Sequence, residues 1–100
     1  MPASFRLEQN YPNPFNPSTT ISFTLPEDAS VTLRIYSLTG QLVRQVASGN
    51  YANGTHHVVW DAKDEAGSHV ASGIYFYKLV VQPESGGARF VQTRKMTLLK

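Results

Sequence analysis

The chain contains no cysteine, and this absence removes several kinds of chemistry at once. Disulfide bonds, structural zinc sites built on thiolates and thiol catalysis all require cysteine, although many exported bacterial proteins do without it. No apolar run approaches the roughly 20 residues that span a bilayer as a helix. Charge is sparse as well: charged residues are 16% of the chain, and its nine lysines and arginines are scattered along it. We therefore expect no transmembrane segment and no nucleic-acid partner, which would require a concentrated basic stripe.

The N-terminus, Met1-Pro2-Ala3-Ser4, lacks the charged and apolar regions of a secretory signal. We expect residues 1–4 to be an engineered start and residues 5–100 to be one domain of a larger protein whose upstream passenger part carries the export signal. Hydrophobic residues make up 41% of the 100 residues, which is enough to build one hydrophobic core.

A proline-rich entry segment at residues 10–18 contains three of the six prolines. Proline pushes the residue before it out of the helical region, so this segment is predicted to be extended or turning. Its two aromatic residues, Tyr11 and Phe15, are expected to anchor it against the rest of the fold.

Alternating apolar and polar residues predict β-strands along most of the remaining chain. Val58 and Trp60 are assigned to the core, and the strand at 73–81, which is apolar on both faces except for Lys78, is predicted to be central. The fold class is therefore an all-β, immunoglobulin-like antiparallel β-sandwich of about seven strands. The strands evident in the sequence are 20–25, 31–36, 41–47, 55–61, 73–81 and 88–99.

The turn between two of these strands contains Asn53-Gly54-Thr55, which matches the acceptor pattern for N-glycosylation. Asn-Gly is also the strongest short signal for a β-hairpin, and we favour the hairpin because it needs no further assumption. Gly40 is predicted to take the left-handed position of the preceding turn.

An acidic loop follows Trp60 and includes Asp61, Asp64 and Glu65, whose oxygens are suitable calcium ligands. Their spacing does not fit an EF-hand, and acidic turns usually serve backbone hydrogen bonding, so we favour a structural role and keep calcium as the alternative. His56 and His57 point to opposite faces of a strand and cannot chelate one metal ion together.

Nothing in the sequence indicates catalysis or a cofactor. There is no Gly-x-Ser-x-Gly nucleophile elbow, and a sandwich of this size offers little room for a ligand cleft. We expect a non-catalytic domain.

A carbohydrate-binding or adhesion module of a secreted hydrolase remains an alternative, because Tyr11, Tyr36 and Tyr51 could stack on sugar rings if they were exposed.

Several segments in order resemble the C-terminal sorting domains of the type IX (Por) secretion system, which are related to the immunoglobulin-like domain of flagellar hook-capping proteins. The resemblance begins with an entry signature and continues to the end of the chain. Its parts are Tyr11-Pro12-Asn13-Pro14-Phe15-Asn16-Pro17-Ser18-Thr19-Thr20-Ile21, Leu33 to Gln41, Gly54-Thr55-His56, Trp60-Asp61, Asp64, Gly67, Ser72-Gly73-Ile74-Tyr75 and Lys95-Met96-Thr97-Leu98-Leu99-Lys100.

The resemblance implies a folded export tag. Its parent would reach the periplasm, cross the outer membrane through the type IX translocon, and become secreted or held at the cell surface. The implied partners are this secretion machinery and a surface sortase-like peptidase, and the residues linked with translocon recognition are Lys95 to Lys100. A structural assembly domain, like that of hook-capping proteins, is the second alternative. An unpaired edge strand could also join two copies in a weak homodimer.

Overall fold

The computed structural model describes residues 4–15 and 17–99. Asn16 of the entry signature and Lys100 of the predicted recognition tail lie outside the described residues, as do residues 1–3. Seven strands follow one another along the described chain. They are β1 (Arg6–Leu7), β2 (Thr19–Leu25), β3 (Ala29–Ser37), β4 (Leu42–Tyr51), β5 (Gly54–Trp60), β6 (Gly73–Pro83) and β7 (Phe90–Leu98).

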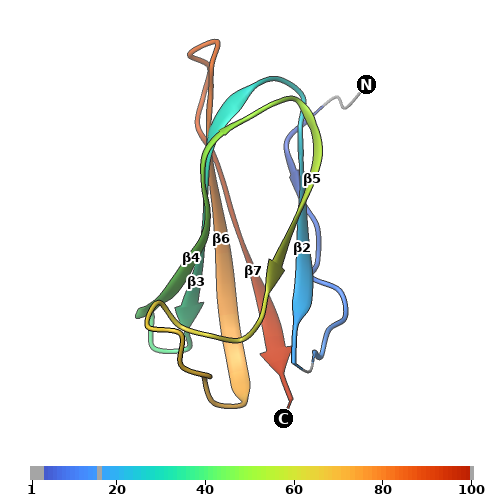
Figure 1. The fold of residues 1–100 in the computed structure, drawn as a ribbon. Coiled ribbons are helices and arrows are strands. Elements are labelled where there is room, and N and C mark those ends of the chain that lie inside the picture. The colour runs from blue at the N-terminus through green and yellow to red at the C-terminus, as the bar shows by residue number, and fades with distance from the viewer. Residues whose placement is uncertain (1–3, 16, 100) are drawn as a thin grey trace.

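The strands form two sheets that pack face to face (Figure 1). One sheet has three strands in the order β1-β2-β5, and the other has four in the order β4-β3-β6-β7. Every pairing between these strands is antiparallel. The predicted all-β, immunoglobulin-like sandwich is therefore confirmed.

Among the described residues no helix is long and apolar enough to cross a membrane.

The core lies between the two sheets, where alternate residues of each strand point inward. Ile21, Phe23 and Leu25 of β2 are fully buried, as the alternation predicts. Trp60 at the end of β5 is 1% exposed and is among the largest of the fully buried side chains, so its assignment to the core is confirmed. Val58, on the same face of β5, is partly buried against this core.

The predicted strand at 73–81 is central, because β6 pairs with β3 on one side and β7 on the other. The fold also contains a two-residue strand, β1, that the alternation did not reveal. Two residues are too few to show a period in sequence, and β1 is recognised only by its pairing of Arg6 with Thr24 and Leu7 with Phe23. β4 also extends beyond the predicted 41–47.

The Asn53-Gly54 turn is not a hairpin. β4 pairs with β3 and β5 pairs with β2, so Ala52 and Asn53, between β4 and β5, carry the chain from one sheet to the other. Asp28 stabilises this corner, because its Oδ1 accepts hydrogen bonds from the Asn53 backbone N–H at 2.9 Å and side-chain amide at 3.2 Å. Gly54 has a φ of +119°, which favours glycine, but it is the first residue of β5, and the predicted pairing of the two flanking strands with each other is wrong.

Replacing Leu33 with alanine should lower the free energy of unfolding by about 2 to 5 kcal/mol, because truncation of a fully buried leucine leaves a cavity. Leu38→Ala is the matched control, since Leu38 is 66% exposed in the turn after β3 and its truncation should change stability by less than about 0.5 kcal/mol. Urea unfolding followed by Trp60 fluorescence measures both. Equal losses in the two variants would contradict the assignment of Leu33 to the core.

Candidate functional site

The proline-rich entry segment lies beside the last strand, which brings together two parts of the chain more than 80 residues apart. Phe15 and Leu98 form a parallel bridge. The Phe15 N–H donates to the Thr97 carbonyl, and the Leu99 N–H donates to the Phe15 carbonyl, both at 3.0 Å. The entry signature and the predicted recognition tail therefore form one continuous feature at one end of the sandwich (Figure 1).

Two side chains extend this contact along the free edge of β7. Asn13 Oδ1 accepts a hydrogen bond from the Thr97 N–H at 3.0 Å, and Gln9 Nε2 donates to the Lys95 carbonyl at 2.8 Å. An edge strand otherwise presents unpaired backbone groups that invite pairing with another chain. We call the feature formed by residues 9–15 and 95–99 the strap, because it covers this part of the edge.

Phe15 anchors the strap in the core, as expected. It is 1% exposed, and its ring lies 5.6 Å from that of Trp60, which in turn lies 5.5 Å from the ring of Tyr75. The expectation that Tyr11 is a second anchor is wrong, because its side chain is 81% exposed. Tyr11 contributes through its backbone instead, exchanging two hydrogen bonds of 2.9 Å with Thr20.

A buried polar group that the sequence did not reveal closes the turn of the strap. Asn10 is 2% exposed and Thr19 is equally buried. The Asn10 side-chain amide donates to Thr19 Oγ1 at 3.0 Å and to the Pro12 carbonyl at 3.2 Å, and Thr19 Oγ1 donates to the same carbonyl at 2.9 Å. Because burial of an unpaired amide is costly, this set of bonds explains a polar pair in the core.

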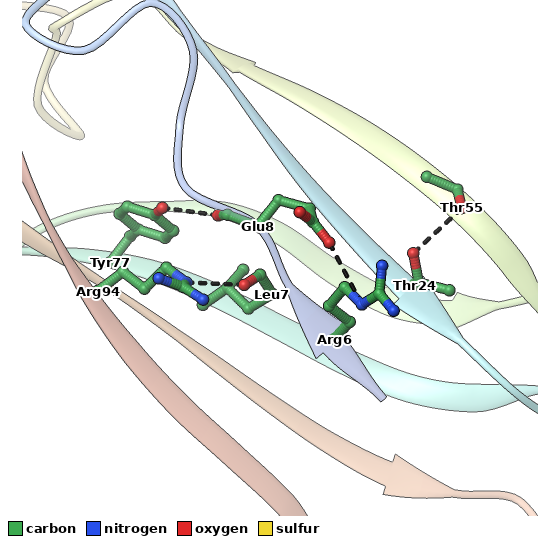
Figure 2. A network of polar contacts seen from close by, with 7 residues as sticks. All are labelled: Arg6, Leu7, Glu8, Thr24, Thr55, Tyr77 and Arg94. Carbon is green, nitrogen blue, oxygen red and sulfur yellow. Dashed lines mark hydrogen bonds and ion pairs between the residues drawn. The ribbon is translucent and has the colours of Figure 1, made fainter. Parts of the chain in front are cut away.

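Tyr77 and Arg94, on the four-stranded sheet, hold β1 and the residue that follows it. Figure 2 shows both side chains reaching from β6 and β7 to the backbone of Leu7 and Glu8. The Tyr77 hydroxyl donates to the Glu8 carbonyl at 2.7 Å and accepts from the Asn10 N–H at 2.8 Å, and Arg94 Nε donates to the Leu7 carbonyl at 2.7 Å. The two sheets are therefore joined by directed hydrogen bonds in addition to apolar packing.

Burial raises the pKa of the Tyr77 phenol above its ordinary value. The hydrogen bond with the Asn10 N–H and the positive charge of Arg94 lower it, but burial is the larger effect. The folded protein therefore favours the neutral phenol, which is the form that can donate to the Glu8 carbonyl.

Only alternate residues of the predicted recognition tail are available to a partner. Met96 and Leu98 are fully buried in the core. Lys95 is exposed, Thr97 is half-buried, and Leu99 is 54% exposed. Any protein that binds the described part of this tail meets Lys95 and Leu99 beside the exposed surface of the strap.

The acidic loop is organised by backbone hydrogen bonds. Asp64 Oδ1 accepts from the N–H groups of Ala66 and Ser68, both at 3.0 Å, and the Asp61 carboxylate lies 3.9 Å from Lys63 Nζ. Within residues 4–15 and 17–99, no three acidic or imidazole side chains are grouped so that they could hold a metal ion. The structure thus shows Asp64 forming the turn and does not bring Asp61, Asp64 and Glu65 together as a ligand set.

The histidines of β5 point to opposite faces, as predicted. The His56 ring packs against Phe23 and Tyr51, at centroid distances of 5.4 and 5.1 Å, whereas His57 Nδ1 lies 2.7 Å from Ser22 Oγ. They belong to two different surroundings.

The three tyrosines considered for sugar stacking do not share a surface. Tyr11 belongs to the strap, and Tyr36 pairs across the sheet with Phe76. Tyr51 pairs with Ala29 at the far end of β3, and its ring packs edge-on against Phe23. A platform formed by all three rings is therefore absent.

The model of the family described as "FlgD Ig-like domain" matches residues 12–87. None of the curated proteins matches this chain.

Three solved structures illustrate the structural likeness. Dimeric latent PorU from Porphyromonas gingivalis has 25% sequence identity and a TM-score of 0.75, over 97% of this chain and 10% of PorU. FlgD from P. aeruginosa has 23% identity and a TM-score of 0.64, over 80% of this chain and 60% of FlgD. PorZ from Porphyromonas gingivalis, described as an essential surface component of the type IX secretion system, has 22% identity and a TM-score of 0.54, over 92% of this chain and 11% of PorZ.

Replacing Tyr77 with phenylalanine should destabilise the domain by about 1 to 3 kcal/mol, because the Asn10 N–H and Glu8 carbonyl lose their partner inside the fold. Tyr11→Phe removes the same hydroxyl from a side chain that is 81% exposed and should leave stability within about 0.5 kcal/mol of the wild type. Urea unfolding near neutral pH measures both values. A Tyr77→Phe variant as stable as Tyr11→Phe would contradict the role given to this hydroxyl.

The same phenol predicts a loss of stability in alkali. Its pKa in the folded protein lies above the unfolded value near 10, so its contribution is fully present below about pH 10 and is lost as pH rises through the folded pKa. The difference in unfolding free energy between the wild type and Tyr77→Phe should therefore shrink as pH rises above about 10, as urea titrations at successive pH values would show. A constant difference over this range would show that the phenol does not titrate with unfolding.

Proposed function

The chain belongs to the FlgD Ig-like domain family, and we propose that within this family it is a non-catalytic sorting domain of the type IX secretion system. In this role it would lie at the C-terminal end of an exported protein, and the translocon in the outer membrane would recognise it in its folded form. The FlgD-like domain is a structural fold, which agrees with a role as a ligand of other proteins.

The strap is the observation that supports this proposal most. The entry signature and the C-terminal ending are the segments most characteristic of the sorting-domain resemblance, yet they stand at opposite ends of the sequence. In the fold they share backbone hydrogen bonds between Phe15, Thr97 and Leu99. A recognition surface made from both segments exists only when the domain is folded, which is the property that a folded export tag requires.

The structural neighbours support the same direction. This chain corresponds to about a tenth of PorU and of PorZ, so in each of these larger proteins the likeness is to one domain-sized part. PorZ is described as a surface component of the type IX system. The activity of any larger parent of our chain, its passage through the periplasm and its release or display at the cell surface are parts of the proposal.

The partners in this proposal follow from the accessible residues. Lys95 and Leu99, with the exposed prolines of the entry segment, would contact the translocon. A surface sortase-like peptidase would act on the chain upstream of the domain, where the passenger is attached. Weak pairing between two copies would use an edge strand outside the strap, because the C-terminal part of the β7 edge is already hydrogen-bonded.

A second candidate is a structural assembly domain, and the family match favours it. FlgD from Xanthomonas campestris, whose structure is described as giving insights into the hook capping essential for flagellar assembly, shares the fold with a TM-score of 0.67 over 93% of this chain, at 19% identity. In that role the same surface would bind other subunits of a polymer and would not direct export. Secretion of a fused reporter distinguishes the two candidates.

Deleting the tail would be a poor test, because it removes Met96 and Leu98 from the core. Substituting its exposed residues avoids this difficulty. We predict that a reporter with a periplasmic export signal and this domain at its C-terminus is secreted by a host with a type IX system. The double variant Lys95→Ala, Leu99→Ser should keep its thermal unfolding midpoint but leave the reporter in the periplasm, as cell fractionation would measure.

The control variant is Arg6→Ala, Leu38→Ser, which removes one exposed cation and one exposed leucine away from the tail. It should be secreted like the wild type. Retention of the wild-type fusion, under conditions in which a known sorting domain exports the same reporter, would rule out the sorting role. Secretion of the tail variant at the wild-type level would show that the translocon does not recognise Lys95 and Leu99.

A further inference from the structure

The strands of the four-stranded sheet carry positive charge without any negative charge. β3, β4, β6 and β7 contain Arg34, Arg44, Lys78, Arg94 and Lys95, and they contain no aspartate or glutamate. Arg44 and Arg94 are engaged with backbone carbonyls, of Asp64 at 3.3 Å and of Leu7 at 2.7 Å. Arg34, Lys78 and Lys95 remain on the outer face, which points away from the other sheet.

Two of these cations face each other directly. Arg34 of β3 and Lys78 of β6 are partners in the antiparallel register. Side chains in such positions have Cβ atoms about 4.5 to 5.5 Å apart, and like charges placed there destabilise a sheet. A sequence that keeps this unfavourable pair breaks a local rule of sheet stability, and such breaks are expected at functional sites.

Arg89 is a third cation, and together with Arg34 and Lys78 it lines one shallow hollow of about 310 Å³. Its lining residues are Thr32, Arg34, Lys78, Val80, Arg89 and Val91. Arg34 Nε donates to Gln45 Oε1 at 2.9 Å, which orients the guanidinium without neutralising it. In the described part of the chain the ion pairs are Arg6 with Glu8 and Lys63 with Asp61, so no carboxylate pairs with the three cations of the hollow.

We propose that this hollow binds a phosphate-type oxyanion. Three cations around one site match a group of about −1.5 to −2 charges better than the single charge of a carboxylate, and a phosphate offers three acceptor oxygens. Arginine binds such groups with two parallel hydrogen bonds, while lysine acts as a point charge. An anion between Arg34 and Lys78 converts their repulsion into two attractions, which explains why the pair is tolerated.

The hollow suits both free phosphate and a phosphate ester, and the residues next to it distinguish the two. Tyr36 and Phe76 pair with each other two residues along the strands from Arg34 and Lys78, so they lie on the same outer face. Both are half-buried. The organic part of an ester, such as a sugar ring, would reach this aromatic pair. This site does not depend on the sorting role.

NMR titration of the isotopically labelled domain with inorganic phosphate and with glucose 6-phosphate, at low and constant ionic strength, tests the proposal. Saturable shifts are expected at the backbone amides of Thr32, Arg34, Lys78, Arg89 and Val91. Arg34→Gln and Lys78→Gln should each weaken binding about tenfold, equivalent to about 1.4 kcal/mol. Arg6→Gln, which removes a cation from β1 in the other sheet, should leave the affinity unchanged.

Thermal unfolding provides a second readout, in which Lys78→Gln should be stabilising in chloride although it weakens the binding of phosphate. In chloride at low ionic strength, Lys78→Gln should raise the unfolding midpoint, because it removes the repulsion with Arg34. In phosphate of equal ionic strength, the wild type should gain stability and the variant should gain less. Tighter binding of glucose 6-phosphate than of phosphate would identify an ester as the ligand, and equal or weaker binding would identify the free anion.

Three results would overturn the proposal. The first is a titration in which the shifts do not saturate. The second is an equal loss of affinity in Arg6→Gln, which would show a diffuse charge effect. The third is a polyglutamate peptide that saturates the shifts of the same amides at a lower concentration of negative charge than either phosphate probe does. That result would assign the hollow to an acidic polypeptide.

Discussion

The pairing of Phe15 with the edge of β7 is the contact on which the rest of this structure depends. Its backbone completes the hydrogen bonding of Thr97 and Leu99 in the four-stranded sheet. Its ring packs on Trp60, which ends β5 in the other sheet. One residue of an otherwise irregular segment therefore joins both layers, and the hydrogen bonds of Tyr77 repeat this connection at Glu8 and Asn10.

This connection makes recognition and folding inseparable at the end of the chain. β7 alternates between buried residues, such as Met96 and Leu98, and accessible ones, such as Lys95. A partner that binds the accessible residues in this arrangement therefore distinguishes a domain whose core has formed from an unfolded one. The same strap occupies backbone groups that would otherwise be available to a foreign strand, so the edge is protected without a charged or bulged residue at each position.

Charge is distributed by structural role in this protein. The acidic residues lie outside the seven strands, whereas the charged residues in the strands of the four-stranded sheet are all lysine or arginine. A net charge of +2 hides this separation, because loops and sheet faces nearly cancel in the total. Lys95 pairs with Phe76, two residues along β6 from Lys78, so one residue of the proposed sorting surface lies on the same outer face of the sheet as the proposed anion-binding hollow.

The fold class, most strands and the core positions of Phe15, Trp60 and the inward residues of β2 could be predicted from the sequence, because a period of two and a burial preference are local properties. Asn53-Gly54 shows the limit: the sequence predicts that one strand ends and another begins here, but the sheet to which each flanking strand belongs depends on partners far along the chain. Exposure of Tyr11, burial of Asn10 and the convergence of the entry segment on residues 95–99 were decided by the tertiary structure alone. They depend on backbone groups and side chains that meet only after both sheets have closed, and no local pattern records which distant groups will satisfy one another.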